Sequence, residues 1–122
     1  MLKYANPTHF LRLADAAVPW LGAVTAGLFA LGLYLGFFNA PADYQQGDTV
    51  RIMFIHVPAA WLSLFVYAAM TLAALGTLVW RHPLADAAQK TAAPIGAAFT
   101  FICLVTGSLW GKPMWGTWWV WD

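Results

Sequence analysis

The chain has 122 residues, of which 61% are hydrophobic and only 9% are charged, and its formal net charge is +1. About a quarter of the residues in an average soluble domain are charged, so this chain has too few charges to cover a water-facing surface. The composition therefore predicts a membrane protein, and the absence of a basic patch argues against nucleic-acid binding. The single cysteine, Cys103, excludes an internal disulfide, and its apolar surroundings favour a small buried hydrophobe.

The first apolar run extends from Ala16 to Phe38 and contains no charged residue. Its 23 residues would form about 34 Å of helix, which is enough to cross roughly 30 Å of hydrocarbon. Lys3 and Arg12 precede the run as they would in a signal peptide. However, the run is too long for a signal peptide and no cleavage site is clear, so we interpret it as a retained membrane anchor.

A polar loop rich in turn residues follows at Asn39–Arg51, and the next apolar run extends from Ile52 to Trp80. Proline suits the first turn of a helix and disfavours helical geometry in the residue before it. Pro58 therefore predicts a helix over residues 58–80, with Ile52–Val57 as a lead-in segment at the membrane interface.

The third apolar run, Thr91–Gly111, follows a short polar loop at Arg81–Lys90 and has Pro94 in its first turn. The three runs predict an all-α fold, a polytopic membrane bundle with spans at about 16–38, 58–80 and 91–111. We treat residues 1–122 as a single membrane domain. Because the chain stops within an aromatic stretch, we expect it to be a fragment of a larger protein.

The distribution of lysine and arginine predicts the orientation, because these residues are more frequent in cytoplasmic segments. Four of them flank one side of the spans, namely Lys3, Arg12, Arg81 and Lys90. Arg51 and Lys112 flank the other side. A cytoplasmic N-terminus follows, with the first loop and the C-terminal segment outside, which is the periplasm in a Gram-negative bacterium.

Residues 110–122 contain five tryptophans among thirteen residues. An aromatic belt at the membrane interface explains one or two tryptophans at the end of a span, but not five. If the segment is helical, Trp115, Trp119 and Asp122 share one face and Trp118 lies beside them. Such an amphipathic external segment has a flat aromatic side that could stack on a large planar ligand.

Residues Trp115–Asp122 match the W-G-x-x-W-x-W-D pattern of the haem-handling protein family, which is often called the WWD domain. Within that family the chain resembles the cytochrome c maturation protein C (CcmC) group. The resemblance extends over nearly the whole chain, through Ala40–Gly47, His56–Trp61, Ala93–Gly96 and Thr106–Gly116. Its G-K-P-M-W-G lead-in and short H-V-P-A-A segment separate it from the larger haem ligation subunits.

The resemblance implies a six-span protein of the bacterial inner membrane, of which this chain is the N-terminal half. Proteins of this family hold haem b non-covalently at the outer face, between the tryptophan-rich segment and two axial histidines. They present it to a membrane-anchored haem chaperone with the help of an ABC-type complex. His56 matches the first axial histidine, and the second belongs to a later loop. The implied haem contacts are His56, Trp110, Trp115, Gly116, Trp118, Trp119, Trp121 and Asp122.

His56 also stands out from the residues alone, because it is an ionisable group near the outer end of an apolar run. A neutral imidazole is a common iron ligand. The alternative is a packing histidine that bonds a carbonyl of a neighbouring helix, and the residues alone leave both interpretations open. His9 and His82 lie in polar cytoplasmic segments, where solvated histidines are expected.

Two other functions compete with haem binding and delivery. A membrane permease, or a structural subunit of a transport complex, is the first alternative, but a permease would place polar groups at mid-membrane, where these spans are apolar. An electron-transfer subunit is the second, but it would ligate haem deep between helices, whereas His56 is near the surface. The chain has no C-x-x-C-H site for covalent haem and no motif of nucleophile and base, so we predict no enzyme.

Overall fold

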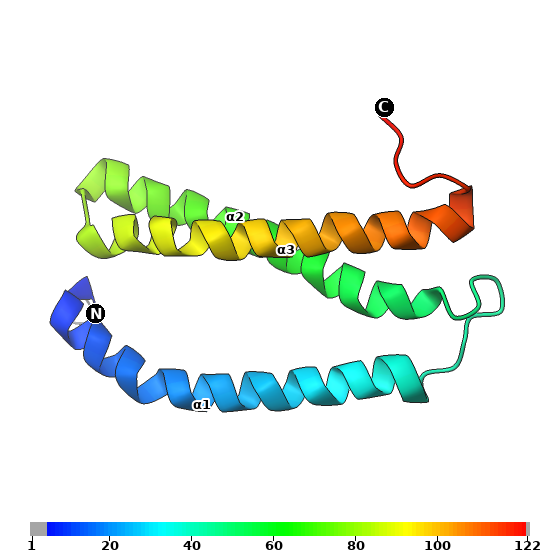
Figure 1. Ribbon diagram of the computed structural model, residues 1–122. Coiled ribbons are helices and arrows are strands. Elements are labelled where there is room, and N and C mark those ends of the chain that lie inside the picture. The colour runs from blue at the N-terminus through cyan, green and yellow to red at the C-terminus, as the bar shows by residue number, and fades with distance from the viewer. Residues whose placement is uncertain (1–4, 122) are drawn as a thin grey trace. The chain divides into compact units, whose positions relative to one another are not determined.

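The computed structural model describes residues 5–121 and contains three long helices in that range (Figure 1). Helix α1 spans Pro7–Tyr34 and continues into a π-helical turn, η2, at Leu35–Asn39. Helix α2 spans Val50–Trp80 and α3 spans Pro83–Trp115. Each of the three is long and apolar enough to cross a membrane. The predicted all-α fold with three candidate spans is therefore confirmed.

The chain divides into two compact units, residues 1–40 and 41–122. In the first unit, Asn6 caps α1 by accepting a hydrogen bond from the Thr8 amide at 2.9 Å, and Pro7 occupies the first turn. The helix thus begins nine residues before the apolar run at Ala16, because polar residues can be helical outside the hydrocarbon.

The second unit opens with a compact turn, which lies within the polar, turn-rich loop predicted at Asn39–Arg51. The Asp43 carboxylate accepts hydrogen bonds from the amides of Gln45 and Gln46 at 3.0 and 2.9 Å. Asp43 and Gly47 also form an isolated antiparallel bridge, and Gly47 adopts a left-handed conformation with φ of 61°. These local bonds place the Gln46 side chain beside the end of α3, as described below.

The prediction that the second helix begins at Pro58 is wrong. Helix α2 begins at Val50, so Pro58 lies inside it and Ile52–Val57 is helical. An extended segment of apolar residues at the membrane would leave its backbone groups without partners, whereas a helix satisfies all but the one bond that proline removes. The correction places Met53 and His56 one helical turn apart on the same side of α2.

The connection between α2 and α3 is much shorter than the predicted loop Arg81–Lys90. Arg81 ends α2 in a left-handed conformation with φ of 51°, and the His82 ring accepts a hydrogen bond from the Leu84 amide at 3.1 Å. Pro83 then begins α3, whose first turns contain an Asp86–Lys90 ion pair of 3.1 Å. Capping by His82, Pro83 in the first turn and the charge pair at i, i+4 stabilise helix in residues 83–90, which their polarity alone predicted to be a loop.

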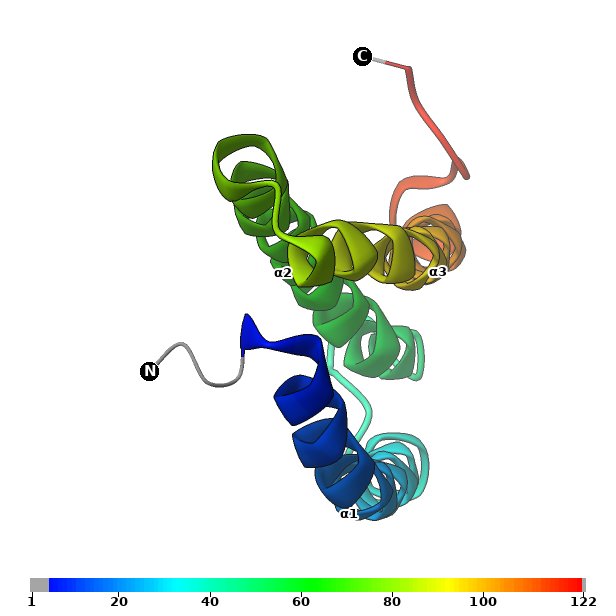
Figure 2. The same cartoon turned by 90° about the vertical axis from the view of Figure 1, so that its left-hand side faces the viewer.

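Helices α2 and α3 form a hairpin and pack side by side (Figure 1, Figure 2). The contact uses small residues: a Cβ atom on Gly76 would lie 3.0 Å from Ala85, and one on Gly96 would lie 2.9 Å from Val66. The Thr77 hydroxyl also donates to the Gln89 side chain at 3.1 Å. Small residues let helix backbones approach closely in lipid, and Gly76 and Gly96 have this role in the contact between α2 and α3.

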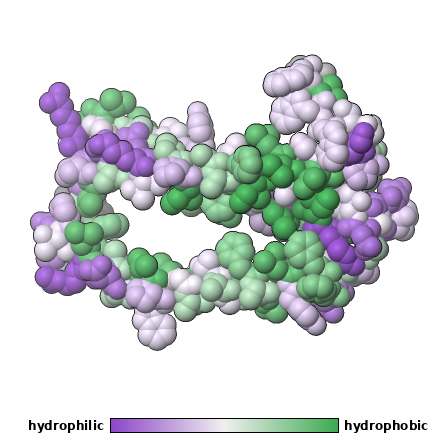
Figure 3. Space-filling view, in the orientation of Figure 1, coloured by the Kyte–Doolittle hydropathy of each residue, from purple (hydrophilic) through white to green (hydrophobic). Residues whose placement is uncertain are grey.

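Most large apolar side chains between residues 5 and 121 are exposed, and Ala59 is the one hydrophobic side chain of that range that is buried. Hydrophobic atoms cover the middle of the helices in Figure 3, while hydrophilic atoms gather toward the helix ends. An exposed apolar surface of this extent is suited to contact with lipid or further membrane helices.

Candidate functional site

The tryptophan-rich segment begins where α3 ends. Gly116 terminates the helix with φ of 80°, and its amide donates to the Lys112 carbonyl at 2.8 Å. The Lys112 ammonium in turn donates to the Gly116 carbonyl at 3.0 Å. A glycine in the left-handed conformation is a common helix stop, and the nearby lysine adds a favourable charge at the C-terminus.

The predicted helical face of Trp115, Trp119 and Asp122 is therefore not formed. Residues 117–121 have no regular helix, and the Thr117 hydroxyl donates to the Trp119 carbonyl at 3.1 Å. This local bond offers the backbone an alternative to helical pairing. Asp122 lies outside the described residues.

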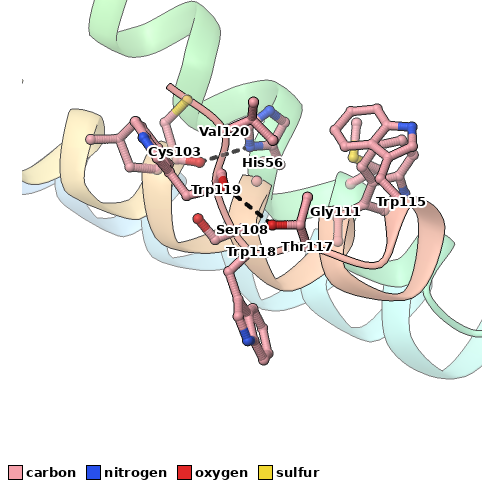
Figure 4. Close-up of a pocket in the computed structure, with 13 residues that line it drawn as sticks. His56, Cys103, Ser108, Gly111, Trp115, Thr117, Trp118, Trp119 and Val120 are labelled. Carbon is pink, nitrogen blue, oxygen red and sulfur yellow. Dashed lines mark hydrogen bonds between the residues drawn. The ribbon is translucent and has the colours of Figure 1, made fainter. Parts of the chain in front are cut away.

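The segment borders an open pocket of about 490 Å³ beside the ends of α2 and α3. This volume is within the range of small-molecule sites, roughly 300–1,000 Å³. The pocket is lined by α2, by α3 and by the residues that follow α3, which we call the tail (residues 117–121). The lining residues are Met53 and His56 from α2, Cys103, Leu104, Gly107, Ser108, Trp110, Gly111 and Trp115 from α3, and Thr117, Trp118, Trp119 and Val120 from the tail (Figure 4). Two segments far apart in sequence thus contribute to one cavity.

His56 is half-buried on the α2 side of this pocket and is fixed by α3. Its Nδ1 lies 2.9 Å from the Cys103 carbonyl oxygen and 3.0 Å from the Thr106 hydroxyl oxygen. The carbonyl can only accept, so the imidazole carries its proton on Nδ1 and donates it to Cys103. Nε2 is then the nitrogen with a free lone pair, and no hydrogen bond within residues 5–121 occupies it.

Gly107 makes this approach of the imidazole possible. A Cβ atom at Gly107 would lie 3.1 Å from His56 Cε1 and 3.5 Å from Nδ1. A side chain there would push the imidazole away from α3, so the glycine sets how closely His56 can approach its hydrogen-bond partners.

Tryptophans form much of the remaining wall. Trp110 and Trp115 pack edge to face with ring centroids 4.9 Å apart. The Trp110 indole donates to the Gln46 side chain at 2.8 Å, which ties the first loop to the end of α3. Trp118 and Trp119 line the pocket from the tail, although the Trp118 indole extends away from His56 (Figure 4). The Lys112 ammonium lies 5.8 Å from the Trp118 ring.

Most of the predicted site residues meet in this pocket, namely His56, Trp110, Trp115, Trp118 and Trp119. Gly116 forms the turn that starts the tail and is not part of the lining. Trp121 is 89% exposed and packs on Trp119 with ring centroids 5.4 Å apart, outside the lining.

Sequence reasoning missed Met53, the α3 residues opposite His56 and the Gln46 contact. Cys103 is not the buried hydrophobe that was predicted, because it is half-buried and lines the pocket. The missed residues share a helical spacing, since Cys103, Gly107 and Trp110 recur at i, i+4 and i+7 on one face of α3. That spacing predicts that the three residues share one face of α3, but it does not predict that His56 of α2 packs against this face.

The donor set of the pocket suits a planar aromatic ligand that already holds its own metal. Residues 5–121 contain no cluster of three or more His, Cys, Asp or Glu side chains that could hold a bare ion. His56 supplies one nitrogen donor, and the indoles supply apolar, stackable walls. Lys112 and Arg51 are the two cationic side chains near this end of the hairpin, and both already have partners within the chain. Lys112 donates to the Gly116 carbonyl, and Arg51 pairs with Asp48 at 3.1 Å.

Comparison with known proteins gives a consistent result over the whole chain. A family model described as "Heme exporter protein C" (CcmC) matches residues 1–122. The chain is similar to heme exporter protein C of Bradyrhizobium diazoefficiens, with 66% identity over 122 residues, which is 100% of this chain and 46% of that protein. It is 52% identical to heme exporter protein C of Escherichia coli K12 over 120 residues, 98% of this chain and 49% of that protein.

A further relative comes from a plant. The putative cytochrome c biosynthesis ccmC-like mitochondrial protein of Marchantia polymorpha is 55% identical over 95 residues, 78% of this chain and 42% of that protein. The chain thus spans about half the length of the curated relatives it matches.

Proposed function

Because the chain belongs to the heme exporter protein C family, we propose that its pocket binds haem b as a cargo for cytochrome c maturation. His56 is the proposed axial ligand to the haem iron. Trp110, Trp115, Trp118 and Trp119 are the proposed walls around the porphyrin. The binding is non-covalent, since the chain has one cysteine and no C-x-x-C-H site.

The observation that carries this proposal is the arrangement of His56. Its Nδ1 is bonded to the Cys103 carbonyl at 2.9 Å, so the lone pair is on Nε2, in a side chain that lines an open, tryptophan-walled pocket. Ligating histidines commonly donate their other ring N–H to a carbonyl or carboxylate, which fixes the tautomer and raises the basicity of the ligand. The arrangement is that of a ligand prepared for a metal.

We propose that a second axial histidine lies outside these 122 residues. His82 follows the far end of α2, and Trp80 at that end is already 24 residues from His56, about 36 Å of helix. A common axial pair of His56 and His82 is therefore excluded by distance. The doubled length of the relatives supports a six-span protein in which this chain supplies half of the haem site.

The open side of the pocket supports presentation of the haem to another protein in place of permanent storage. We propose a membrane-anchored haem chaperone as the receiver and ABC-type transporter subunits as partners in release, at the outer face of the bacterial inner membrane. A permease is less well supported, because His56, the ionisable side chain that joins α2 to α3, lies beside the tryptophan-rich end of the hairpin.

The test is His56→Ala in the full-length protein, measured by the visible spectrum of haem that co-purifies in detergent. The mutation removes the nitrogen ligand and also a packing group, so it cannot decide alone. We expect loss of the six-coordinate spectrum, and at least partial recovery when free imidazole is added, because a small ligand can enter the vacated space.

His9→Ala and His82→Ala serve as matched controls and should keep the parent spectrum. An unchanged spectrum in His56→Ala would show that His56 is a packing residue and that the iron has another ligand. Loss of haem from all three variants alike would indicate a general fault in assembly.

A further inference from the structure

Thr106 is the one polar side chain between residues 5 and 121 that is buried, with 9% of its surface exposed. It lies on α3, one turn beyond Cys103, and its hydroxyl faces the imidazole of His56 across the helix contact at 3.0 Å. Burying a hydroxyl is costly unless its hydrogen-bonding capacity is used. The contacts around it show how that capacity is used.

The hydroxyl proton of Thr106 is directed to its own helix. Its oxygen donates to the Ile102 carbonyl at 2.6 Å, and the Cys103 carbonyl is farther away at 3.2 Å. A hydroxyl has one proton and two lone pairs, so the side of the oxygen that faces His56 acts as an acceptor. Nδ1 of His56 therefore faces two acceptors, this oxygen and the Cys103 carbonyl.

Other threonines on these helices make the same intrahelical bond without this second contact. Thr100, for example, donates to the Gly96 carbonyl at 2.8 Å and is exposed. The bond to the preceding turn is thus an ordinary feature of helical threonine, and the buried contact with His56 is what sets Thr106 apart.

We propose that Thr106 is a positioning residue for His56. With its proton committed to Ile102, its oxygen joins the Cys103 carbonyl in holding the imidazole proton on Nδ1, and Nε2 keeps a lone pair for the pocket. The effect of Thr106 on haem binding rests on the function proposed above, whereas its effect on the tautomer of His56 does not. Two acceptors on the Nδ1 proton make the imidazole a stronger electron donor at Nε2.

The first test requires no haem. The full-length protein, labelled with ¹⁵N-histidine in detergent micelles, gives imidazole nitrogen shifts that report the tautomer, and the His56 signals are assigned from their loss in His56→Ala. We expect the Nδ1–H form in the parent and in Thr106→Ser, which keeps the hydroxyl. Thr106→Val keeps the shape but removes the acceptor, so its signals should shift toward the Nε2–H form.

Thr100→Val is the matched control, because it removes an equivalent intrahelical bond from the same helix. It should leave the His56 signals unchanged. An Nε2–H tautomer in the parent would overturn the proposal without any variant, and so would identical His56 signals in the parent and Thr106→Val.

The second test uses the haem-loaded protein and measures the reduction potential of the iron. Weaker donation from Nε2 should shift the potential of Thr106→Val to a more positive value, while Thr106→Ser and Thr100→Val stay close to the parent. If His56→Ala leaves the haem spectrum unchanged but the tautomer shifts as expected, the proposed function fails and the positioning role stands. If His56 is the ligand and Thr106→Val moves neither tautomer nor potential, the positioning role fails alone.

Discussion

The two ring nitrogens of His56 bear on a choice that the sequence left open between a packing histidine and a metal ligand. Nδ1 bonds the Cys103 carbonyl of the neighbouring helix, as a packing histidine would. The same bond leaves the lone pair on Nε2, which is what a ligand needs. The packing contact is therefore compatible with the iron binding proposed for His56.

Gly107 allows a test of this geometry without altering His56. In Gly107→Ala the new Cβ would lie 3.1 Å from His56 Cε1, so the imidazole must shift by a few tenths of an ångström, which weakens its contacts with Cys103 and Thr106. Because loss of such supporting contacts typically weakens metal binding 10–100-fold, we expect haem affinity to fall by roughly tenfold or more. Haem titration of the purified full-length protein measures it.

Gly96→Ala is the control for this prediction. Its Cβ would approach Val66 Cγ1 at 2.9 Å, so it disturbs the same helix contact away from His56. Equal losses of affinity in the two variants would attribute the effect to helix packing in general and would contradict the specific role of Gly107.

At the scale of the elements, the sequence predicted the helices better than their ends. Long runs without charge could be recognised because a membrane helix needs about 20 apolar residues. The start of α2 was misplaced because Pro58 was interpreted as the first turn of the helix, as is common in soluble proteins. In lipid, a helix that continues through Pro58 is favoured. The end of α3 was also misplaced. The tryptophan spacing suggested a helix up to Asp122, but Gly116 and the Thr117 hydroxyl stop the helix after Trp115.

The candidate site was predictable in composition and not in geometry. His56 and the tryptophans stood out by residue type, whereas the contact of His56 with Cys103, Thr106 and Gly107 joins residues about 50 positions apart. Neither periodicity nor local propensity encodes which faces of α2 and α3 meet. That choice depends on the small residues along the whole contact.

The tail allows a prediction about which tryptophans contact a porphyrin. Trp115 and Trp119 line the pocket, so replacing both with alanine removes two aromatic contacts of about 0.5–1.5 kcal/mol each beyond their buried area. Haem retained per protein should fall by roughly tenfold, since about 1.4 kcal/mol corresponds to that factor. Absorbance of haem relative to protein after purification measures the loss.

Trp121→Ala provides the contrast, because Trp121 is 89% exposed and outside the pocket lining. It should retain haem close to the parent level. If the double variant loses only expression while haem per protein stays constant, the tryptophans act as an interfacial belt.

At the scale of the molecule, the α2–α3 hairpin links the position of the pocket to the topology of the chain. The Trp110–Gln46 bond of 2.8 Å holds the first loop beside the end of α3, so both lie at the same end of the hairpin. The connection at Arg81 and His82 lies at the other end. If the hairpin spans a membrane, the loop and the tryptophan-rich tail share one side and the connection faces the opposite side.

The charges then predict which side is which. Arg81 and Lys90 flank the connection, Lys3 and Arg12 lie near the N-terminus, and the excess of four cations over two predicts that this side is the cytoplasmic face. The pairing of Lys90 with Asp86 does not weaken this argument, because acidic residues contribute little to orientation. We therefore expect alkaline phosphatase, which is active only in the periplasm, to be active when fused after Gly47 or Asp122 and inactive when fused after Asp86. Activity after Asp86 together with inactivity at the other two positions would invert the topology and place the pocket on the cytoplasmic face, which would contradict the proposed delivery of haem to a chaperone at the outer face.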